Sequence, residues 1–279
     1  MRTDNTQTAA AAKAHSALGN GTDIDECIRE LDAESNAAPQ RRGDPGDPAA
    51  IGGGVLAGFT LVLRSPYLLG ICVSMLLFST LATFLYFQQA AIVRDAFTDT
   101  ASRTTVFASM DFATNALTLI AQLFVTSRLI RRAGIAVTLA IVPAALMIGF
   151  VLLSLSPAVA LVLIVQILRR AGNFALMRPA REMLYTVLKR ETKYKAKGFI
   201  DTAVYRGGDA VSAWAYAGMT SLGLGSAAIA AIAVPLSALW TLVAFALGRH
   251  HRKLCEASAN RIEKAPQNAA LTSSQGDRA

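Results

Sequence analysis

Seven polar or charged side chains fall inside long apolar stretches of this sequence, where they could bind an anion. An arginine guanidinium is planar, stays charged and binds phosphate or carboxylate oxygens through paired hydrogen bonds. An ionisable side chain at the centre of a membrane helix costs about 2.5–3.5 kcal/mol to insert, so it normally faces a cavity or a partner. The predicted substrate-binding residues are Arg169, Arg170, Arg206, Asp209, Asp111, Asn115 and Asn173.

The spacing of these residues leaves two interpretations open. In the first, the three arginines outnumber the two aspartates in a water-accessible cavity that attracts an anionic solute. In the second, the charges form interhelical ion pairs, such as Arg206 with Asp209 or Arg169 with Asp111, and only hold the helices together. A rise of 1.5 Å per residue puts Arg169 and Asp209 roughly 16–18 Å from the ends of their helices, near the membrane midplane.

The elements that would position these residues are membrane-spanning helices. The chain has 279 residues, of which 53% are hydrophobic and only 16% charged, whereas soluble domains carry about 25% charged residues. A bilayer core takes about 20 helical residues to cross, and uncharged stretches run over residues 65–93, 133–168 and 210–248. The last two are long enough for two helices each and are broken by Pro157 and by the glycines between 218 and 225. The predicted all-α membrane domain, residues 66–248, has six transmembrane helices at 66–91, 104–127, 134–154, 157–178, 199–221 and 226–248.

The charges of the connecting segments predict the orientation of this domain. Segments 128–132, 189–197 and 249–253 are strongly basic, and the alternate connections have no net charge. Because basic loops stay in the cytoplasm, we expect both termini to be cytoplasmic and the protein to lie in a bacterial-type inner membrane. Residues 1–50 are predicted to be a largely disordered cytoplasmic segment, 51–65 a short pre-membrane segment and 249–279 a basic, polar cytoplasmic tail.

Motifs that would indicate an enzyme are missing. The sequence has no phosphate-binding loop, no dinucleotide fingerprint and no Cys/His metal spacing. A membrane-embedded enzyme acting on lipid phosphates would also need a nucleophile and a base near the arginines, and none is evident. We therefore expect no enzymatic activity, cofactor, metal or nucleic-acid partner.

Two local patterns carry a resemblance to known transporters. Six spans, cytoplasmic ends and a basic 131–134 loop (Arg-Arg-Ala-Gly) resemble one half of a major facilitator superfamily transporter. The run NFALMRPAREM (173–183) resembles a segment of the bacterial and plastid ATP/ADP translocase family that contains a Pro-Thr-Lys-Glu-Met-like run. The segment from Lys195 to Asp201 resembles that family's Lys-x-Lys-Gly-Lys-x-x-x-Asp segment.

The resemblance implies alternating-access transport of an anionic solute, such as a nucleotide, without hydrolysis. It implies gating or packing roles for Arg181, Glu182, Lys197 and Asp201. A full transporter of this kind has twelve spans and binds its substrate between two halves, so the chain corresponds to the C-terminal half. It would need a homodimer or a separate six-helix partner in the lipid bilayer. The alternative is a non-transporting membrane scaffold or a truncated remnant of a twelve-helix transporter.

Overall fold

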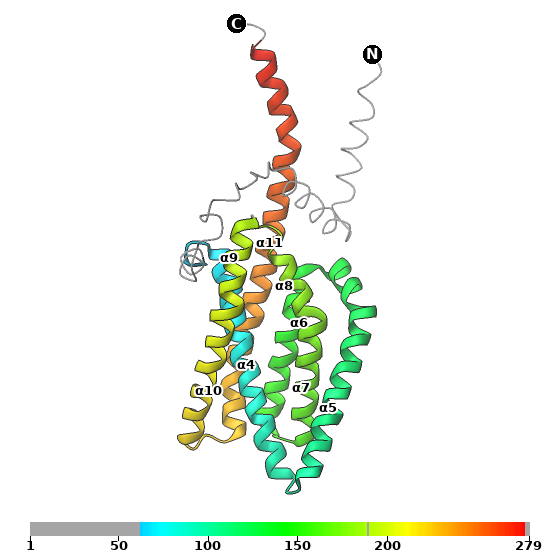
Figure 1. Ribbon diagram of the computed structural model, residues 1–279, viewed down its shortest axis with the longest axis vertical. Coiled ribbons are helices and arrows are strands. Elements are labelled where there is room, and N and C mark those ends of the chain that lie inside the picture. The colour runs from blue at the N-terminus through cyan, green and yellow to red at the C-terminus, as the bar shows by residue number, and fades with distance from the viewer. Residues whose placement is uncertain (1–61, 189, 277–279) are drawn as a thin grey trace, which may run out of the picture.

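The computed structural model describes residues 62–188 and 190–276, with side chains for 62–188 and 192–257. The predicted segment 1–50 and most of 51–65 lie outside the described residues. Every described element is a helix, and the helices lie side by side along the long axis of the molecule (Figure 1). The elements are α4 (Pro66–Ala96), α5 (Thr100–Ile120), η2 (Ala121–Thr126), α6 (Ser127–Leu155), α7 (Val159–Gly172), η3 (Asn173–Met177), α8 (Arg178–Leu184), α9 (Arg190–Phe199), η4 (Ile200–Val204), α10 (Tyr205–Ser221) and α11 (Ser226–Gly276), where η marks a π-helix.

Within the described residues, four helices are long and apolar enough to cross a membrane. They are Pro66–Ala96, Thr100–Leu155, Val159–Leu184 and Ser226–Ala257. The second has 56 residues and contains both predicted helices 104–127 and 134–154. It bends at Gly134, whose φ of 77° is a backbone conformation that glycine adopts without steric cost. The described part of the chain is therefore all-helical, and its apolar helices indicate a membrane-embedded protein, while six crossings remain a prediction.

Segments predicted as two loops and a tail are helical instead. The basic connection 128–132 lies in α6. The basic connection 189–197 largely belongs to α9, and the segment after residue 248 continues α11 to Gly276. Charged residues mark where the hydrocarbon ends, but Arg, Lys, Glu and Ala are also good helix formers. The predicted helix start at residue 199 and helix end at residue 248 therefore follow the charges and differ from the helix boundaries of the structure.

Local capping explains where the other helices begin. Ser65 accepts a hydrogen bond from the Leu68 N–H at the start of α4, and Pro66 fits the first turn. Asp99 caps α5 by accepting from the Ser102 N–H at 3.0 Å, and this hydrogen bond lowers the pKa of the Asp99 carboxyl. Gly223, with φ 81°, makes the turn from α10 to α11. The predicted break between residues 218 and 226 is confirmed.

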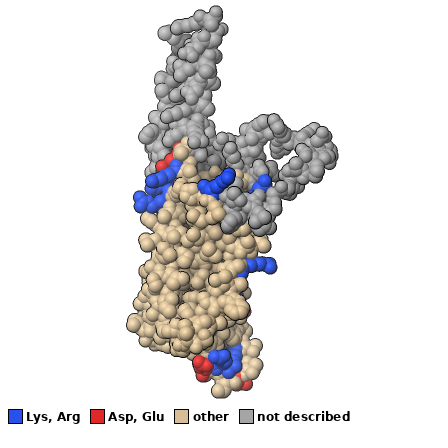
Figure 2. Space-filling view, turned by 90° about the vertical axis from the view of Figure 1, so that its left-hand side faces the viewer, with Lys and Arg blue, Asp and Glu red and all other residues tan. Residues whose placement is uncertain are grey.

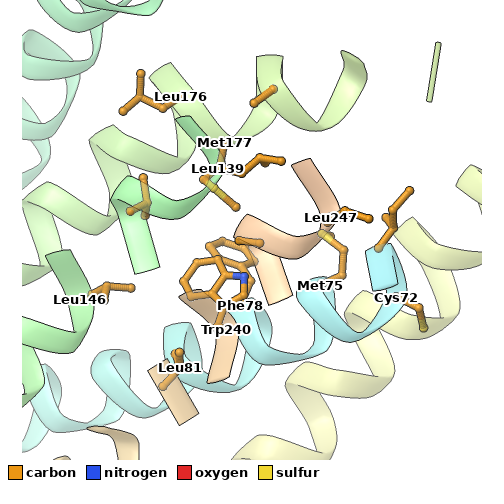
Figure 3. Packing of buried hydrophobic residues seen from close by; sticks show 14 of the residues in the cluster. Cys72, Met75, Phe78, Leu81, Leu139, Leu146, Leu176, Met177, Trp240 and Leu247 are labelled. Atoms are coloured by element: carbon orange, nitrogen blue, oxygen red, sulfur yellow. The ribbon is translucent and has the colours of Figure 1, made fainter. Parts of the chain in front are cut away.

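Helix α4 lies at the centre of the bundle, in contact with α7, α10 and α11. Its buried Phe78 packs against Trp240 of α11 at a ring distance of 5.7 Å, and Figure 3 shows Met75 and Leu139 beside this pair. The indole of Trp240 donates a hydrogen bond to Ser74 Oγ at 3.0 Å. Trp240, the largest fully buried side chain, thus packs against apolar groups, and its one polar group, the indole N–H, has a hydrogen-bond partner.

Helix α5 lies at one edge of the bundle (Figure 1). Only Met110 and Thr114 of its residues are buried, and Phe112 is 77% exposed. No residue of η2, which continues this helix, is buried. This edge helix therefore presents an exposed apolar surface.

Charge is segregated along the long axis. Figure 2 shows Lys and Arg gathered at the end near α9, basic and acidic side chains together at the other end, and an almost uncharged belt between them. A basic side chain projects from this belt. Such a belt fits a hydrocarbon layer, since charged groups are costly there.

The closest approach between two helices supplies a test of the packing. A Cβ added to Gly248 of α11 would overlap the backbone of Ala136 in α6, while a Cβ on Gly218 would meet nothing within 4 Å. We expect Gly248→Ala to lower the free energy of unfolding by about 1–3 kcal/mol, as overpacking does. Gly218→Ala, the matched control, should be neutral or slightly stabilising. Thermal unfolding in mild detergent measures both, and equal midpoints would contradict the α6–α11 crossing.

Candidate functional site

The charged side chains predicted from the sequence to lie deep in the membrane belong to α5, α7 and α10. Asp111 lies on α5, Arg169 and Arg170 on α7, and Arg206 and Asp209 on α10. Residues 133–155 of α6 and 226–248 of α11 have no charge. These two helices form an apolar side of the bundle. The charged side chains lie on α5, α7 and α10.

Arg170 is held by an ion pair between helices. Its Nη1 donates to Asp111 Oδ1, and the two side chains are 31% and 54% exposed. This contact ties the edge helix α5 to α7. The sequence had offered Arg169 as the partner of Asp111, and the structure gives that place to its neighbour, so the ion-pairing interpretation holds for Arg170.

Arg169 has a different environment. Its Nε donates to Gln166 Oε1 at 2.9 Å, a neutral group one turn away on the same helix. Asp209 and Tyr205 are close enough to interact with the guanidinium electrostatically. Among residues 62–188 and 192–257, no carboxylate lies within ion-pair distance of it. Arg169 is therefore a partly buried cation whose charge is only offset at a distance.

Asp209 is bound to hydroxyl groups of α4. Ser79 Oγ donates to Asp209 Oδ1, and Thr83 Oγ1 lies 3.3 Å from the same oxygen. Ser79, which is fully buried, also lies 3.3 Å from the carbonyl oxygen of Tyr205. The hydroxyls were not predicted as site residues, although three hydroxyl side chains within residues 79–83 of an apolar helix are a visible signal.

Gly208 explains why α10 comes this close to α4. A Cβ at that position would lie 3.1 Å from Leu76 Cδ2 and 3.2 Å from Ser79 Oγ, tighter than ordinary contact. One turn further, Ser212 Oγ and Thr80 Oγ1 form a 2.9 Å hydrogen bond. The α4–α10 contact is thus a polar seam rather than a purely apolar one.

The remaining predicted substrate-binding residues are not brought into this group. The Arg206 side chain is exposed on α10, and the predicted Arg206–Asp209 ion pair is not formed. Asn115 is exposed on α5. Asn173 and Arg181 both line a small cavity. This cavity has space for about one water molecule.

A second charged group lies at the basic end of the bundle. Lys197 Nζ of α9 contacts both carboxylate oxygens of Glu182 in α8, at 2.7 and 2.8 Å, and lies 5.9 Å from the centre of the Tyr185 ring. Arg181 Nη1 donates to Met75 Sδ at 2.7 Å. Asp201 lies in η4, within electrostatic range of Tyr185. The residues with predicted gating or packing roles therefore gather around Tyr185, and Glu182 joins Lys197 directly.

Each charged centre adjoins a π-helix. η3 follows Arg169 and Arg170, and η4 precedes Asp209 by a few residues. In η2, the Thr126 hydroxyl donates to the Ala175 carbonyl oxygen of η3 at 2.8 Å. Such turns frequently occur at functional sites because the wider coil frees backbone carbonyls. No feature of the sequence had indicated them.

An open depression of about 530 Å³ lies at the other end of the bundle, where α4, α5 and α10 meet. Phe87, Phe107 and Tyr216 line it together with Arg94 and Arg103. Arg103 donates to the carbonyl oxygens of Phe97 and Arg94 at 2.6 and 3.1 Å. Its guanidinium therefore caps the end of α4, a structural role.

Comparison with models of protein families, with curated proteins and with solved structures gave no match. The resemblance to a major facilitator half and to nucleotide translocases therefore stays a prediction from the residues that carry it.

The Arg170–Asp111 pair can be measured by a double-mutant cycle. We expect Arg170→Gln and Asp111→Asn to be coupled by about 1 kcal/mol in unfolding free energy, the size of a polar contact between membrane helices. The exposed Arg94–Asp95 pair, at 3.6 Å with side chains 68% and 76% exposed, is the control and should show no measurable coupling. Additive effects at Arg170 and Asp111 would contradict the ion pair.

Proposed function

We propose that this protein is a membrane transporter, or one half of one, that moves an anionic solute by alternating access without hydrolysis. The observation that carries the proposal is Arg169, a guanidinium at the predicted mid-membrane depth whose side-chain hydrogen-bond partner is the neutral Gln166. A charge at that depth requires a partner or water. An anionic solute supplies the missing countercharge during the time it is bound.

The neighbouring ion pair supports a specific role for Arg169. Arg170, one residue further, is already neutralised by Asp111. A purely structural use of both arginines would place a carboxylate within ion-pair distance of each, because a charge without a paired partner is destabilising away from water. The contrast favours Arg169 as the substrate-binding arginine and Arg170 as a positioning residue.

We further propose six crossings with cytoplasmic termini, in the arrangement of a major facilitator half. Uncharged stretches of 36 and 39 residues and the charge distribution in Figure 2 support this count. The apolar surface of α5 is where the other half, from a second copy or a separate chain, would pack. A nucleotide or another organic phosphate is the proposed solute class, on the resemblance of residues 173–201 to the translocases.

A membrane scaffold or transporter remnant is the second candidate. The ion pairs Arg170–Asp111 and Lys197–Glu182 favour it, because both already join neighbouring helices without a ligand. A scaffold would use Arg169 only for packing, and its replacement would lower folding yield and change no flux.

Substitution at Arg169 separates the two candidates. We expect Arg169→Gln to lower the affinity for the transported anion roughly 10- to 150-fold, since a hydrogen bond to a charged group contributes about 1.5–3 kcal/mol. Uptake of radiolabelled ATP, ADP and inorganic phosphate into proteoliposomes measures the change. Arg169→Lys, which keeps the charge but not the planar fork, should retain part of the activity.

Arg252→Gln is the control, because the Arg252 side chain is 71% exposed and its ion pair, Nε to Glu256 Oε1 at 3.7 Å, lies within one helix and joins no other helix. It should transport as the unaltered protein does. If neither the unaltered protein nor its mixture with a six-helix partner takes up any of the three anions, the transporter proposal fails.

A further inference from the structure

We infer that Asp209, Ser79 and Thr83 form a binding site for a sodium ion, and that this ion couples to the anion bound at Arg169. The coupling rests on the proposed function, whereas the ion site stands on its own geometry. Three kinds of oxygen converge there: a carboxylate, two hydroxyls and the backbone carbonyl of Tyr205.

Oxygen atoms of α4 and α10 cluster where these two helices touch. Asp209 Oδ1 is contacted by Ser79 Oγ and by Thr83 Oγ1 at 3.3 Å, and Ser79 Oγ lies 3.3 Å from Tyr205 O. Ser79 and Thr83 are one turn apart on α4, so both hydroxyls face the same point of α10. Gly208 removes the side chain that would otherwise hold the two helices apart.

The donor set selects the kind of ion. Oxygen ligands suit hard cations, and transition metals prefer imidazole or thiolate. A single carboxylate balances one positive charge. A divalent ion would therefore leave one uncompensated positive charge beside the positively charged Arg169. Each hydroxyl can rotate to present a lone pair instead of its hydrogen.

Electrostatics links this site to Arg169. The groups that face Asp209 are Ser79 and Thr83 from α4, Arg169 from α7 and Tyr205 on its own helix. While the site is empty, the charge of Asp209 offsets that of Arg169. A bound sodium ion neutralises Asp209, leaves Arg169 with its full charge and raises the affinity for an anion. By linkage, the anion raises the affinity for sodium by the same factor.

Sodium binding can be measured on the purified full-length protein without any transport. At constant ionic strength, replacing choline chloride by sodium chloride should raise the thermal unfolding midpoint in a saturable way, because a ligand that binds only the folded state stabilises it. Asp209→Asn and Ser79→Ala should each abolish this rise. Ser212→Ala is the matched control, since it removes the neighbouring hydroxyl contact with Thr80, and it should keep the sodium response.

The coupling is measured in proteoliposomes. An inward sodium gradient should accumulate the anion in the unaltered protein, and Asp209→Asn should reduce this accumulation about 10-fold or more, whereas Ser212→Ala should leave it unchanged. Unfolding midpoints that are equal in sodium and choline would overturn the ion site. Accumulation driven by a pH gradient through Asp209, with no sodium effect, would overturn sodium in favour of a proton. A sodium-dependent midpoint without any anion uptake would leave the ion site standing and refute the proposed function.

Discussion

The cost of keeping a charge inside a membrane governs the structure of this protein. Each ionisable group placed between the two ends of the bundle costs a few kcal/mol unless a partner or water compensates it. Arg170 has an aspartate, Asp209 has two hydroxyls, and Arg169 has a glutamine and a distant carboxylate. The degree of compensation decreases in that order, and so function is best sought at Arg169.

The same constraint shapes the packing around these groups. Apolar contacts between α4, α6 and α11 build a core around Trp240 and Phe78, and close approach at Gly248 brings α11 against α6. On the other side, α5, α7 and α10 carry the charges, and polar contacts such as Arg170–Asp111 and Ser79–Asp209 join them to their neighbours. An arrangement with one well-packed side and one charged side suits a protein in which the second side contacts a solute or a second set of helices.

The π-helices lie between the charged centres and the basic end. η3 separates Arg169 from the Glu182–Lys197 pair, and η4 separates that pair from Asp209. Because a π-turn weakens the regular hydrogen-bond pattern, bending is easiest where these segments occur. A bend there would move the ion pair at the basic end relative to the mid-membrane groups, which is the kind of motion that alternating access requires.

The sequence alone predicted the helical class, the location of the protein in a membrane and the positions of most helices. Uncharged stretches and breaks at Pro157 and near Gly223 suffice for that, because the bilayer imposes a length and a composition on each segment. It also singled out the charged residues, since a charge inside an apolar stretch is visible without coordinates. It misplaced one helix start at residue 199 and one helix end at residue 248, where the charge boundary and the helix boundary differ.

Which charged side chains contact one another is known only from the packing of the helices. Arg169 and Arg170 are adjacent in the sequence, yet their side chains point in directions about 100° apart around the helix, so one reaches Asp111 and the other Gln166. Ser79 and Thr83 become partners of Asp209 only because α4 and α10, more than 120 residues apart in the chain, touch at Gly208. Pairing across helices depends on how each helix is rotated about its axis and on the distance between the helices. The residue spacing within one segment predicts neither quantity.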